Sequence, residues 1–464
     1  MFKAYRLSLV SLAMVTLLGC TVGPEYIAPQ QVANIELDAP YQQAAQATTW
    51  WQAFDDTELN RLVALALEQN RSLLKASANV YKARALFNDA QNKSLPVVGA
   101  EASYQTSKNA TVSTFDDNTI SRSWALGGKV SWDVDLFGKI ERATQAAAAE
   151  ADNAALLWHD AQVDIISQVA LSYGEYRSAQ KRLLIAQQNL ENLQQTRNIL
   201  NVRLKAGTAS NFDLARFDSQ YYEVKGMVPQ FRQALREAEA TLSALLGYGP
   251  GQLHLSEQTA LPELSQPVAV DSSQHYLRYR ADVASAERTL AAQTANIGVV
   301  TADLYPNLSF SGFLGFISSP NLALNSGSKA WSFAPTVSWV GSDIGSVKAQ
   351  IKAANASTQM ALADFEQAVL QAVNEIQLSV DTYNLSREKQ LFTNQQHKSS
   401  MQAMIIARVR YEAGNGEFYE LLDAEREWLR SRDQQAQIQL QSFASLVAIY
   451  RVFGGGLLLD SPKV

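Results

Sequence analysis

Residues 124–136 decide the fold, and they read Trp-Ala-Leu-Gly-Gly-Lys-Val-Ser-Trp-Asp-Val-Asp-Leu. Apolar and polar side chains alternate along this stretch, as they do in a β-strand with one apolar face. The apolar face holds Trp124, Leu126, Val130, Trp132, Val134 and Leu136. The opposite face holds Lys129, Ser131, Asp133 and Asp135. Taken alone, this alternation is shared by half-buried sheets of soluble proteins and by strands that face lipid.

Two tryptophan pairs favour the lipid-facing alternative. Trp124 and Trp132 are eight residues apart, and so are Trp331 and Trp339 in a second stretch of the same pattern. At ~3.3 Å per residue this spacing is roughly 26 Å along a strand, close to the ~25 Å apolar band between the aromatic girdles of an outer-membrane barrel. We therefore expect these four tryptophans to form a membrane girdle.

The chain provides too few strands to close a barrel. We expect strands at about 97–107, 123–136, 307–317 and 329–340. An open sheet edge in lipid leaves backbone groups unpaired, at a cost of several kcal/mol for each group. The barrel must therefore be shared among chains.

The chain contains two copies of one unit. Trp124 and Trp331, Gly138 and Gly345, Arg203 and Arg410, and Gly207 and Gly414 are each 207 positions apart. We expect a first repeat over 56–260, a second over 261–456 and a C-terminal tail over 457–464. Each repeat should hold a helix, two strands, a very long helix, a glycine turn and a further helix. In the first repeat, residues 56–94 are predicted to be one helix that ends before Pro96.

The predicted long helices, over 138–206 and 345–413, carry a coiled-coil seam. In the first helix the seam steps by four and three through Ile140, Thr144, Ala147, Ala151, Ala154, Trp158, Ala161 and Ile165. No proline interrupts either stretch, and about 65 residues at 1.5 Å each reach ~100 Å. Many seam residues are alanine, which suits close helix walls around a hollow. A cytoskeletal rod is the alternative, but a rod does not explain the strands.

The N-terminus is typical of a bacterial lipoprotein. Lys3 and Arg6 precede an apolar stretch that is too short to span a membrane, and Cys20, the only cysteine, follows it. We expect residues 1–19 to be a signal peptide and Cys20 to be lipidated at the start of an extended segment, 20–55. An ordinary leader with an incidental cysteine is the alternative.

Composition and motifs exclude several classes of function. Lys and Arg number 39 against 45 Asp and Glu, for a net charge of −6, which argues against nucleic acid as a partner. No internal apolar run reaches the ~20 residues of a spanning helix. The chain has no HExxH pattern, no P-loop and no G-x-S-x-G motif. We therefore expect no enzyme, no cofactor and no metal site, and we expect Asp133 and Asp135 to face a pore.

Several short motifs follow one another along nearly the whole mature chain. They are Gly23-Pro24-Glu25-Tyr26, Trp50-Trp51-x-x-Phe54-x-Asp56-x-x-Leu59, Asn70 with Leu73 and Ala76, Leu245-Leu246-Gly247, Arg280-x-Asp282-Val283, Tyr305-Pro306 and Gly454-Gly455-Gly456. In this order they resemble the outer-membrane efflux protein family, the TolC-like channels, and within it the lipoprotein branch of drug-efflux outer-membrane factors. Ala281 stands where the family usually has proline, a change that leaves a helix start viable.

The resemblance implies a mixed α and β fold and a homotrimer. Three chains of four strands each would form a 12-stranded barrel in the bacterial outer membrane, continuing into a long α-helical barrel in the periplasm. Implied partners are a periplasmic adaptor protein, an inner-membrane pump and outer-membrane lipid. The implied function is the exit duct of a tripartite efflux system that passively conducts drugs or other small toxic compounds. The exit duct of a protein-secretion system and a structural coiled-coil lipoprotein are the alternatives.

The glycine turns that end the long helices are candidate sites. Gly207 and Gly414 can supply left-handed caps, and Arg203 and Arg410 are placed where a positive charge complements a helix C-terminus. A simple hairpin of two helices needs the same residues. The resemblance adds that both turns lie at the periplasmic tip and dock the adaptor.

Acidic residues follow each turn. Asp213, with Ser210, fits a capping box, and Glu420 lies early in the next helix, where acids are favourable. Asp423 is nearly one turn deeper on the same face, where that effect fades. The resemblance implies that Asp213, Tyr411, Glu420 and Asp423 line a closed periplasmic gate, where three copies of each acid would form rings.

Overall fold

The computed structural model describes residues 21–29, 42–43, 49–108, 120–256, 260–262, 269–270, 280–319, 326–339 and 341–454. The chain divides into two units. The first consists of Met1–Gln30, Asn79–Ala154 and Ser285–Glu366, and the second of Gln31–Ala78, Ala155–Ala284 and Gln367–Val464. Cys20, the signal peptide, Gly455, Gly456 and the C-terminal tail lie outside the described residues.

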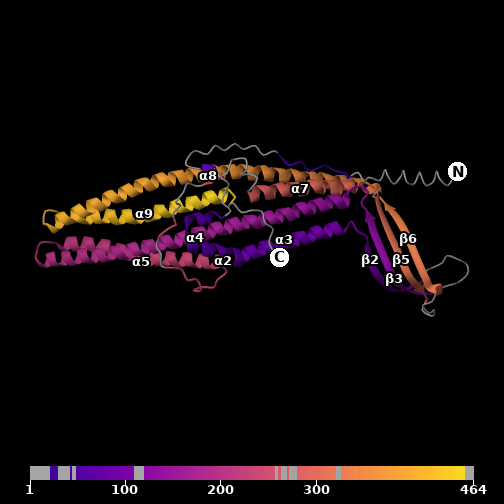
Figure 1. The fold of residues 1–464 in the computed structure, drawn as a ribbon, viewed down its shortest axis with the longest axis horizontal. Coiled ribbons are helices and arrows are strands. Elements are labelled where there is room, and N and C mark those ends of the chain that lie inside the picture. Colours follow the sequence, from indigo (N-terminus) through magenta and orange to yellow (C-terminus); the bar gives the residue numbers. More distant parts are fainter. Residues whose placement is uncertain are drawn as a thin grey trace. The chain divides into compact units, whose positions relative to one another are not determined.

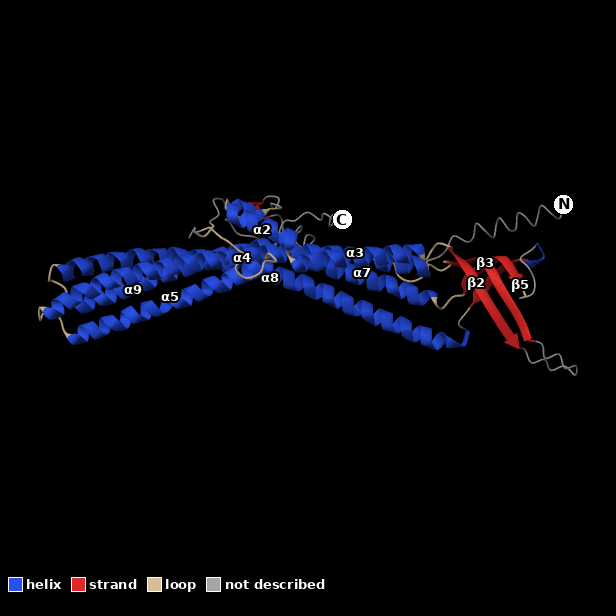
Figure 2. Ribbon diagram, turned by 90° about the horizontal axis from the view of Figure 1, so that it is seen from below, coloured by secondary structure: helices blue, strands red, loops and turns tan. Residues whose placement is uncertain are grey.

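A four-stranded antiparallel sheet belongs to the first unit (Figure 2). Its order is β2-β3-β5-β6, with bounds Val97–Lys108, Ile120–Val134, Asn307–Ser318 and Lys329–Ser338. β3 begins three residues earlier than the expected 123, and β6 ends one residue before Trp339. Short 3₁₀ turns, η2 at Ser326–Ser328 and η3 at Gly341–Asp343, flank β6.

The register gives the sheet a single apolar face. Directly opposed residues of antiparallel strands point to the same side. Trp124 pairs with Tyr104 and Ser318, Trp132 pairs with Phe310, and Trp331 pairs with Leu314. Across the four strands this face carries Val98, Ala102, Tyr104, Trp124, Leu126, Val130, Trp132, Leu308, Phe310, Leu314, Phe316, Trp331, Phe333 and Val337. The face assignment predicted from the alternation is confirmed within the strands. Asp135, Leu136 and Trp339 were predicted to continue these faces but lie beyond β3 and β6, and Asp135 Oδ2 accepts from the backbone N–H of Glu141 at 2.8 Å.

Two glycines allow β3 and β5 to approach closely at mid-sheet. Gly127 and Gly315 are register partners, and a Cβ built on Gly127 would lie 2.7 Å from Gly315 Cα. The same Cβ would lie 2.8 Å from the ring of Phe313, whose side chain is on the polar face of the sheet. Only residues without a side chain fit here, and the Phe313 ring occupies the space above them.

An N-terminal strap also packs in the first unit. Val22 N donates to Phe137 O at 3.1 Å, and the Arg142 guanidinium donates to the carbonyls of Val22 and Gly23 at 3.2 and 3.3 Å. Gly23 has φ +89°, and a Cβ there would lie 2.5 Å from Gly298 Cα. Thr21–Gly23 are therefore held against the segment that directly follows β3.

Long helices form two hairpins in the second unit (Figure 1). The first hairpin is α4 (Lys139–Lys205) with α5 (Asn211–Leu245), and the second is α8 (Ile344–Glu412) with α9 (Phe418–Val452). The N-terminal turns of α4 and α8, and most of α7 (Ala281–Ala302), belong to the first unit. A parallel pair, β1 (Gln42–Gln43) with β4 (Ala269–Val270), completes the elements. No helix in the described ranges has both the length and the apolar character needed to cross a membrane.

The predicted single helix over 56–94 is wrong, because the structure has two helices. α2 (Thr57–Gln69) and α3 (Arg71–Asn92) are separated at Asn70, whose backbone is extended. Asn70 Oδ1 accepts from the backbone N–H of Ser72 and Leu73 at 2.8 and 3.1 Å, and its Nδ2 donates to Leu245 O at 2.7 Å. Asn70 therefore caps α3 and also bonds to the last residue of α5. These hydrogen bonds compensate for those lost at the break between α2 and α3.

The aromatic motif near the N-terminus belongs to the core of the second unit. Trp50–Phe54 form a 3₁₀ turn, η1, so the segment 20–55 is not wholly extended as predicted. Trp50 is 1% exposed and stacks on Tyr450 of α9, with ring centroids 4.8 Å apart. Phe54 packs on Phe443 at 5.2 Å. The motif therefore fastens the chain to α9.

The face assignment predicts opposite effects for two neighbouring residues. Val130→Arg places a charge on the apolar face and should weaken assembly in the membrane by ~2 to 4 kcal/mol if the residue lies near mid-bilayer. Ser131→Arg places the same charge on the polar face and should be tolerated better. The measurement is the fraction of detergent-extracted protein that sediments as the assembled oligomer. Equal losses from both variants would contradict the assignment.

Candidate functional site: the hairpin turns

The two hairpin turns have the same backbone geometry. Gly207 and Gly414 have φ +73° and +77°, in the left-handed region that favours glycine. Thr208 N donates to Arg203 O at 2.9 Å and Asn415 N donates to Arg410 O at 2.9 Å, as expected for Schellman caps. Figure 1 shows both turns at the same end of the second unit.

Arg203 joins the two hairpins. Its Nη2 donates to Tyr411 O at 2.9 Å, and its guanidinium lies over the Tyr411 ring at 4.0 Å. Tyr411 is 4% exposed and also packs on Phe418, 5.6 Å between centroids. Burial raises the pKa of Tyr411, and the positive charge of the nearby Arg203 opposes this shift. The predicted gate residue Tyr411 is therefore buried in a contact between the hairpins within one chain.

The three predicted gate acids each have a partner. Asp213 forms the predicted capping box, since its Oδ2 accepts from Ser210 N at 3.0 Å. Glu420 pairs with Arg410 at 3.4 Å, which brings two predicted site residues together. Asp423 pairs with Arg426 on its own helix at 2.7 Å. The side chains of Glu420 and Asp423 are about half exposed, so neither belongs to the core.

Glu425 is a functional candidate that the sequence analysis missed. It is 3% exposed, and its Oε1 accepts from Arg408 Nη2 at 2.8 Å and from Thr196 Oγ1 at 3.3 Å, while its Oε2 has no partner. The group thus connects α9 to both α8 and α4. Burial raises the pKa of the Glu425 carboxyl, and the ion pair with Arg408 opposes this shift. The sequence does contain a sign that Glu425 is buried, because it lies four residues from both Leu421 and Leu429 on the buried face of α9.

No group of three or more His, Cys, Asp or Glu side chains in the described part of the chain could hold a metal ion. The site is a set of helix turns, inter-hairpin contacts and exposed charges.

An amphipathic sheet and two long helical hairpins in one chain define a class of protein, the outer-membrane channels with a helical extension. The match to a family model is equally specific, since it spans residues 62–248 and 273–455. The chain belongs to the outer membrane efflux protein family. It is an outer-membrane efflux channel.

Known relatives are similar to this chain over nearly their full length. The solved outer-membrane channel OprN has a TM-score of 0.91 and 37% identity, covering 94% of this chain and 100% of that one. The pyoverdine export outer membrane protein OpmQ of Pseudomonas putida is 29% identical, with 90% of each chain covered. Outer membrane protein OprJ of Pseudomonas aeruginosa is 28% identical, covering 98% of this chain and 96% of its own.

Glu425 predicts a pH dependence of stability. Because its folded pKa is raised, the folded state keeps a proton that the unfolded state loses, so stability falls as pH rises through the folded value. Glu425→Gln removes this dependence. The melting temperature of the variant minus that of wild type should therefore increase between about pH 4 and about pH 7.

The matched control is Glu427→Gln, on the half-exposed side of the same helix. Its melting temperature should follow the wild-type pH profile. A parallel profile for Glu425→Gln would show that the buried carboxyl does not control stability.

Proposed function

We propose that the protein is the exit duct of a tripartite efflux system, through which small molecules pass passively after delivery by a periplasmic adaptor and an inner-membrane pump. The observation that carries the proposal is the single apolar face shared by all four strands. Three such sheets form a 12-stranded barrel, and the polar face, with Lys129, Ser131 and Asp133, then lines the lumen. The cargo is a drug or another small toxic compound.

Adaptor docking is supported by apolar side chains at the hairpin turns. Val202 and Phe212 are each 67% exposed and Tyr419 is 53% exposed. Arg216 lies over the Tyr419 ring at 5.0 Å, so the surface combines an aromatic side chain with a positive charge. Exposed apolar groups of this kind mark protein contacts. These apolar side chains lie at the two hairpin turns, whose geometry depends on Arg203, Gly207, Arg410 and Gly414.

The proposed gate adds exposed charge to the same region. Three chains place six acids from Glu420 and Asp423 around the tip, each beside an arginine. Since half-exposed ion pairs are weakly held, the arginines can swing away and leave the acids facing the passage. Asp213 and Tyr411 then support the gate as helix cap and inter-hairpin contact.

Neutralising the ring tests both the duct and its gate. Glu420→Gln with Asp423→Asn removes six negative charges from the trimer, so cation preference and block by added trivalent cations should both fall. The measurement is single-channel recording of purified trimer in planar bilayers. Glu427→Gln, a carboxylate further along α9, is the control and should keep wild-type selectivity. Unchanged selectivity in an assembled double variant would refute the gate, and the absence of current from every protein would refute the duct.

Lipid anchoring at Cys20 is supported by the strap that follows it. Thr21–Gly23 lie against Phe137 and Gly138, directly after β3. The end of β3 carries Trp132, a predicted girdle residue, so an acyl chain on the residue before Thr21 starts close to that interface. The anchor and the sheet would therefore enter the same membrane.

Radiolabelled palmitate should be incorporated into wild-type protein and not into Cys20→Ser. Some function should survive in the variant if it is exported, because the barrel provides its own membrane contact. Unaltered labelling of Cys20→Ser would rule out this residue as the acceptor. Ser94→Ala is a control that should leave labelling intact.

A further inference from the structure

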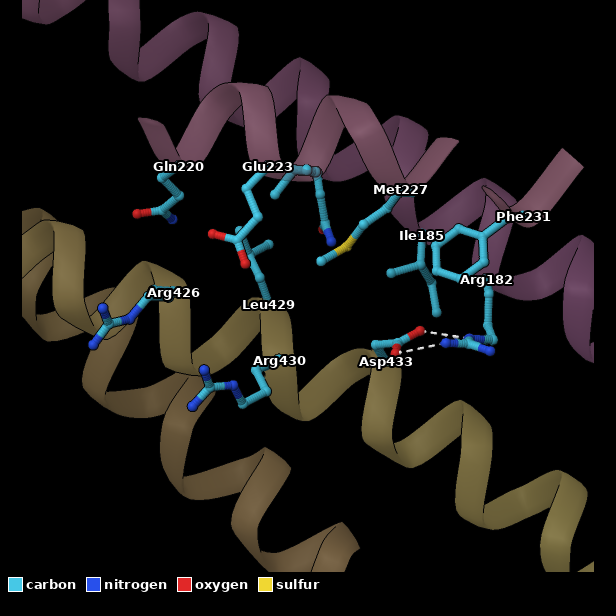
Figure 3. A pocket seen from close by; sticks show the side chains of 13 residues that line it. Arg182, Ile185, Gln220, Glu223, Met227, Phe231, Arg426, Leu429, Arg430 and Asp433 are labelled. Carbon is cyan, nitrogen blue, oxygen red and sulfur yellow. Dashed lines mark hydrogen bonds and ion pairs between the residues drawn. The ribbon is translucent and has the colours of Figure 1, made fainter. Parts of the chain in front are cut away.

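Side chains that bond across two elements join the helices and strands within each unit. In the second unit Arg182 of α4 donates to Asp433 of α9 at 2.6 and 2.9 Å, beside a cavity between the two hairpins (Figure 3). In the first unit, where the sheet meets the helices, Trp132 and Trp339 make contacts of this kind. An indole N–H donates a hydrogen bond without carrying a charge, so it suits the end of a sheet that is predicted to face lipid.

Each of these two tryptophans donates to a backbone carbonyl in the turn that precedes its strand hairpin. Trp132 Nε1 donates to Ser94 O at 2.9 Å, in the turn between α3 (Arg71–Asn92) and β2. Trp339 Nε1 donates to Leu304 O at 3.0 Å, in the turn between α7 and β5. The end of the second strand is thereby tied to the helix that leads into the first strand, and this contact occurs twice in the chain.

The two acceptors are carbonyls at helix ends. Ser94 N and Leu304 N each donate to the carbonyl three residues earlier, at 3.1 Å, so α3 and α7 both end in a tight turn. Pro96 and Pro306 follow, and proline has no N–H with which to continue the turn. A carbonyl at a helix end needs a donor from outside the helix. The indole N–H provides that donor in both places.

The ring of Trp132 also begins a row of aromatic side chains across the sheet. It stacks on Phe310 of β5, with ring centroids 6.0 Å apart, and Phe310 stacks on Phe333 of β6 at 5.6 Å. The row connects β3 with both strands of the other hairpin. Trp132 and Trp339 line one cavity of about 770 Å³, so the two contacts lie at the same end of the sheet.

The other two tryptophans of the predicted girdle differ from this pair. Trp124 and Trp331 make no side-chain hydrogen bond among the residues that the structure describes. Their indole N–H groups therefore stay available to water or lipid. Four tryptophans that the sequence predicts for one role thus divide into two that bond to the helix ends and two that do not.

We propose that Trp132 and Trp339 are joints between the sheet and the helices, each of which sets the direction in which α3 or α7 meets its strand. In a channel such joints keep the wall continuous where strands give way to helices. The inference goes beyond the proposed function, in which these residues serve only as a membrane girdle. Because the indole N–H makes the contact, its loss should loosen one turn and leave the other unchanged.

Hydrogen–deuterium exchange of the purified trimer, read by mass spectrometry, tests each joint separately. Trp132→Phe keeps an aromatic ring and removes the donor, so exchange in residues 93–98 should become about three- to ten-fold faster. Exchange in residues 303–308 should stay as in wild type. Trp339→Phe should give the reverse result. Equal acceleration of both turns in either variant would indicate general loosening and overturn the proposal, as would unchanged exchange at the turn next to the substitution.

The matched controls are Trp124→Phe and Trp331→Phe, which remove indoles without a bond to the helix ends and should leave both turns as in wild type. Each variant is first shown to sediment as the assembled trimer. Where a phenylalanine variant does not assemble, 1-methyltryptophan at the same position keeps the ring and removes only the donor.

Single-channel recording of the same proteins tests whether the joints align the wall. The spread of conductance between channels should at least double in Trp132→Phe and Trp339→Phe and stay at the wild-type value in the two controls. A wild-type spread in a variant whose turn is loosened would overturn the role in alignment. The exchange measurement does not depend on conduction, so its failure leaves the proposed function standing.

Discussion

A peptide group in hydrocarbon must be hydrogen-bonded, and the rest of the molecule depends on this constraint. In the described strands, the order β2-β3-β5-β6 leaves one outer edge on β2 and one on β6. Among the described residues neither edge has a partner strand, and in the proposed assembly each edge pairs with a strand from another copy. In that assembly the backbone of the sheet requires association, independently of the side chains of the helices. The side chains decide which way the sheet faces.

Periodic patterns were sufficient to predict most of the fold. Alternation between Trp124 and Trp132 predicted both the strand and its faces, because the side-chain period of a strand leaves little freedom once one face is apolar. The long helices end within a residue or two of the predicted bounds, at Lys205 and Glu412, because glycine turns follow both of them directly. The girdle, the lipid anchor and the gate stay predictions, since they concern a membrane and other chains.

Contacts between distant segments were beyond the reach of sequence patterns. Asn70 continues a helical pattern in the sequence. The orientation of its side chain as a cap depends on a hydrogen bond from its Nδ2 to the backbone carbonyl of Leu245, 175 positions away. The positive charge of Arg203 is favourable at a helix C-terminus, which is all that the local sequence indicates. In the structure Arg203 also donates to the backbone carbonyl of Tyr411 in the other repeat. Glu425 is similar, because its neighbours Thr196 and Arg408 come from two other helices. In each case the decisive partner is chosen by packing.

The close approach of Gly127 and Gly315 affects the surface that the polar face of the sheet presents. Where two side chains would otherwise project from the polar face of the sheet, the ring of Phe313 lies across the backbone, and Glu101 and Lys129, the register partners of Gly127 and Phe313, belong to the same face. In the proposed duct this ring faces the passage, where it offers a passing molecule few hydrogen-bonding groups. An apolar ring at this point contacts chemically different molecules without selecting one of them by hydrogen bonds.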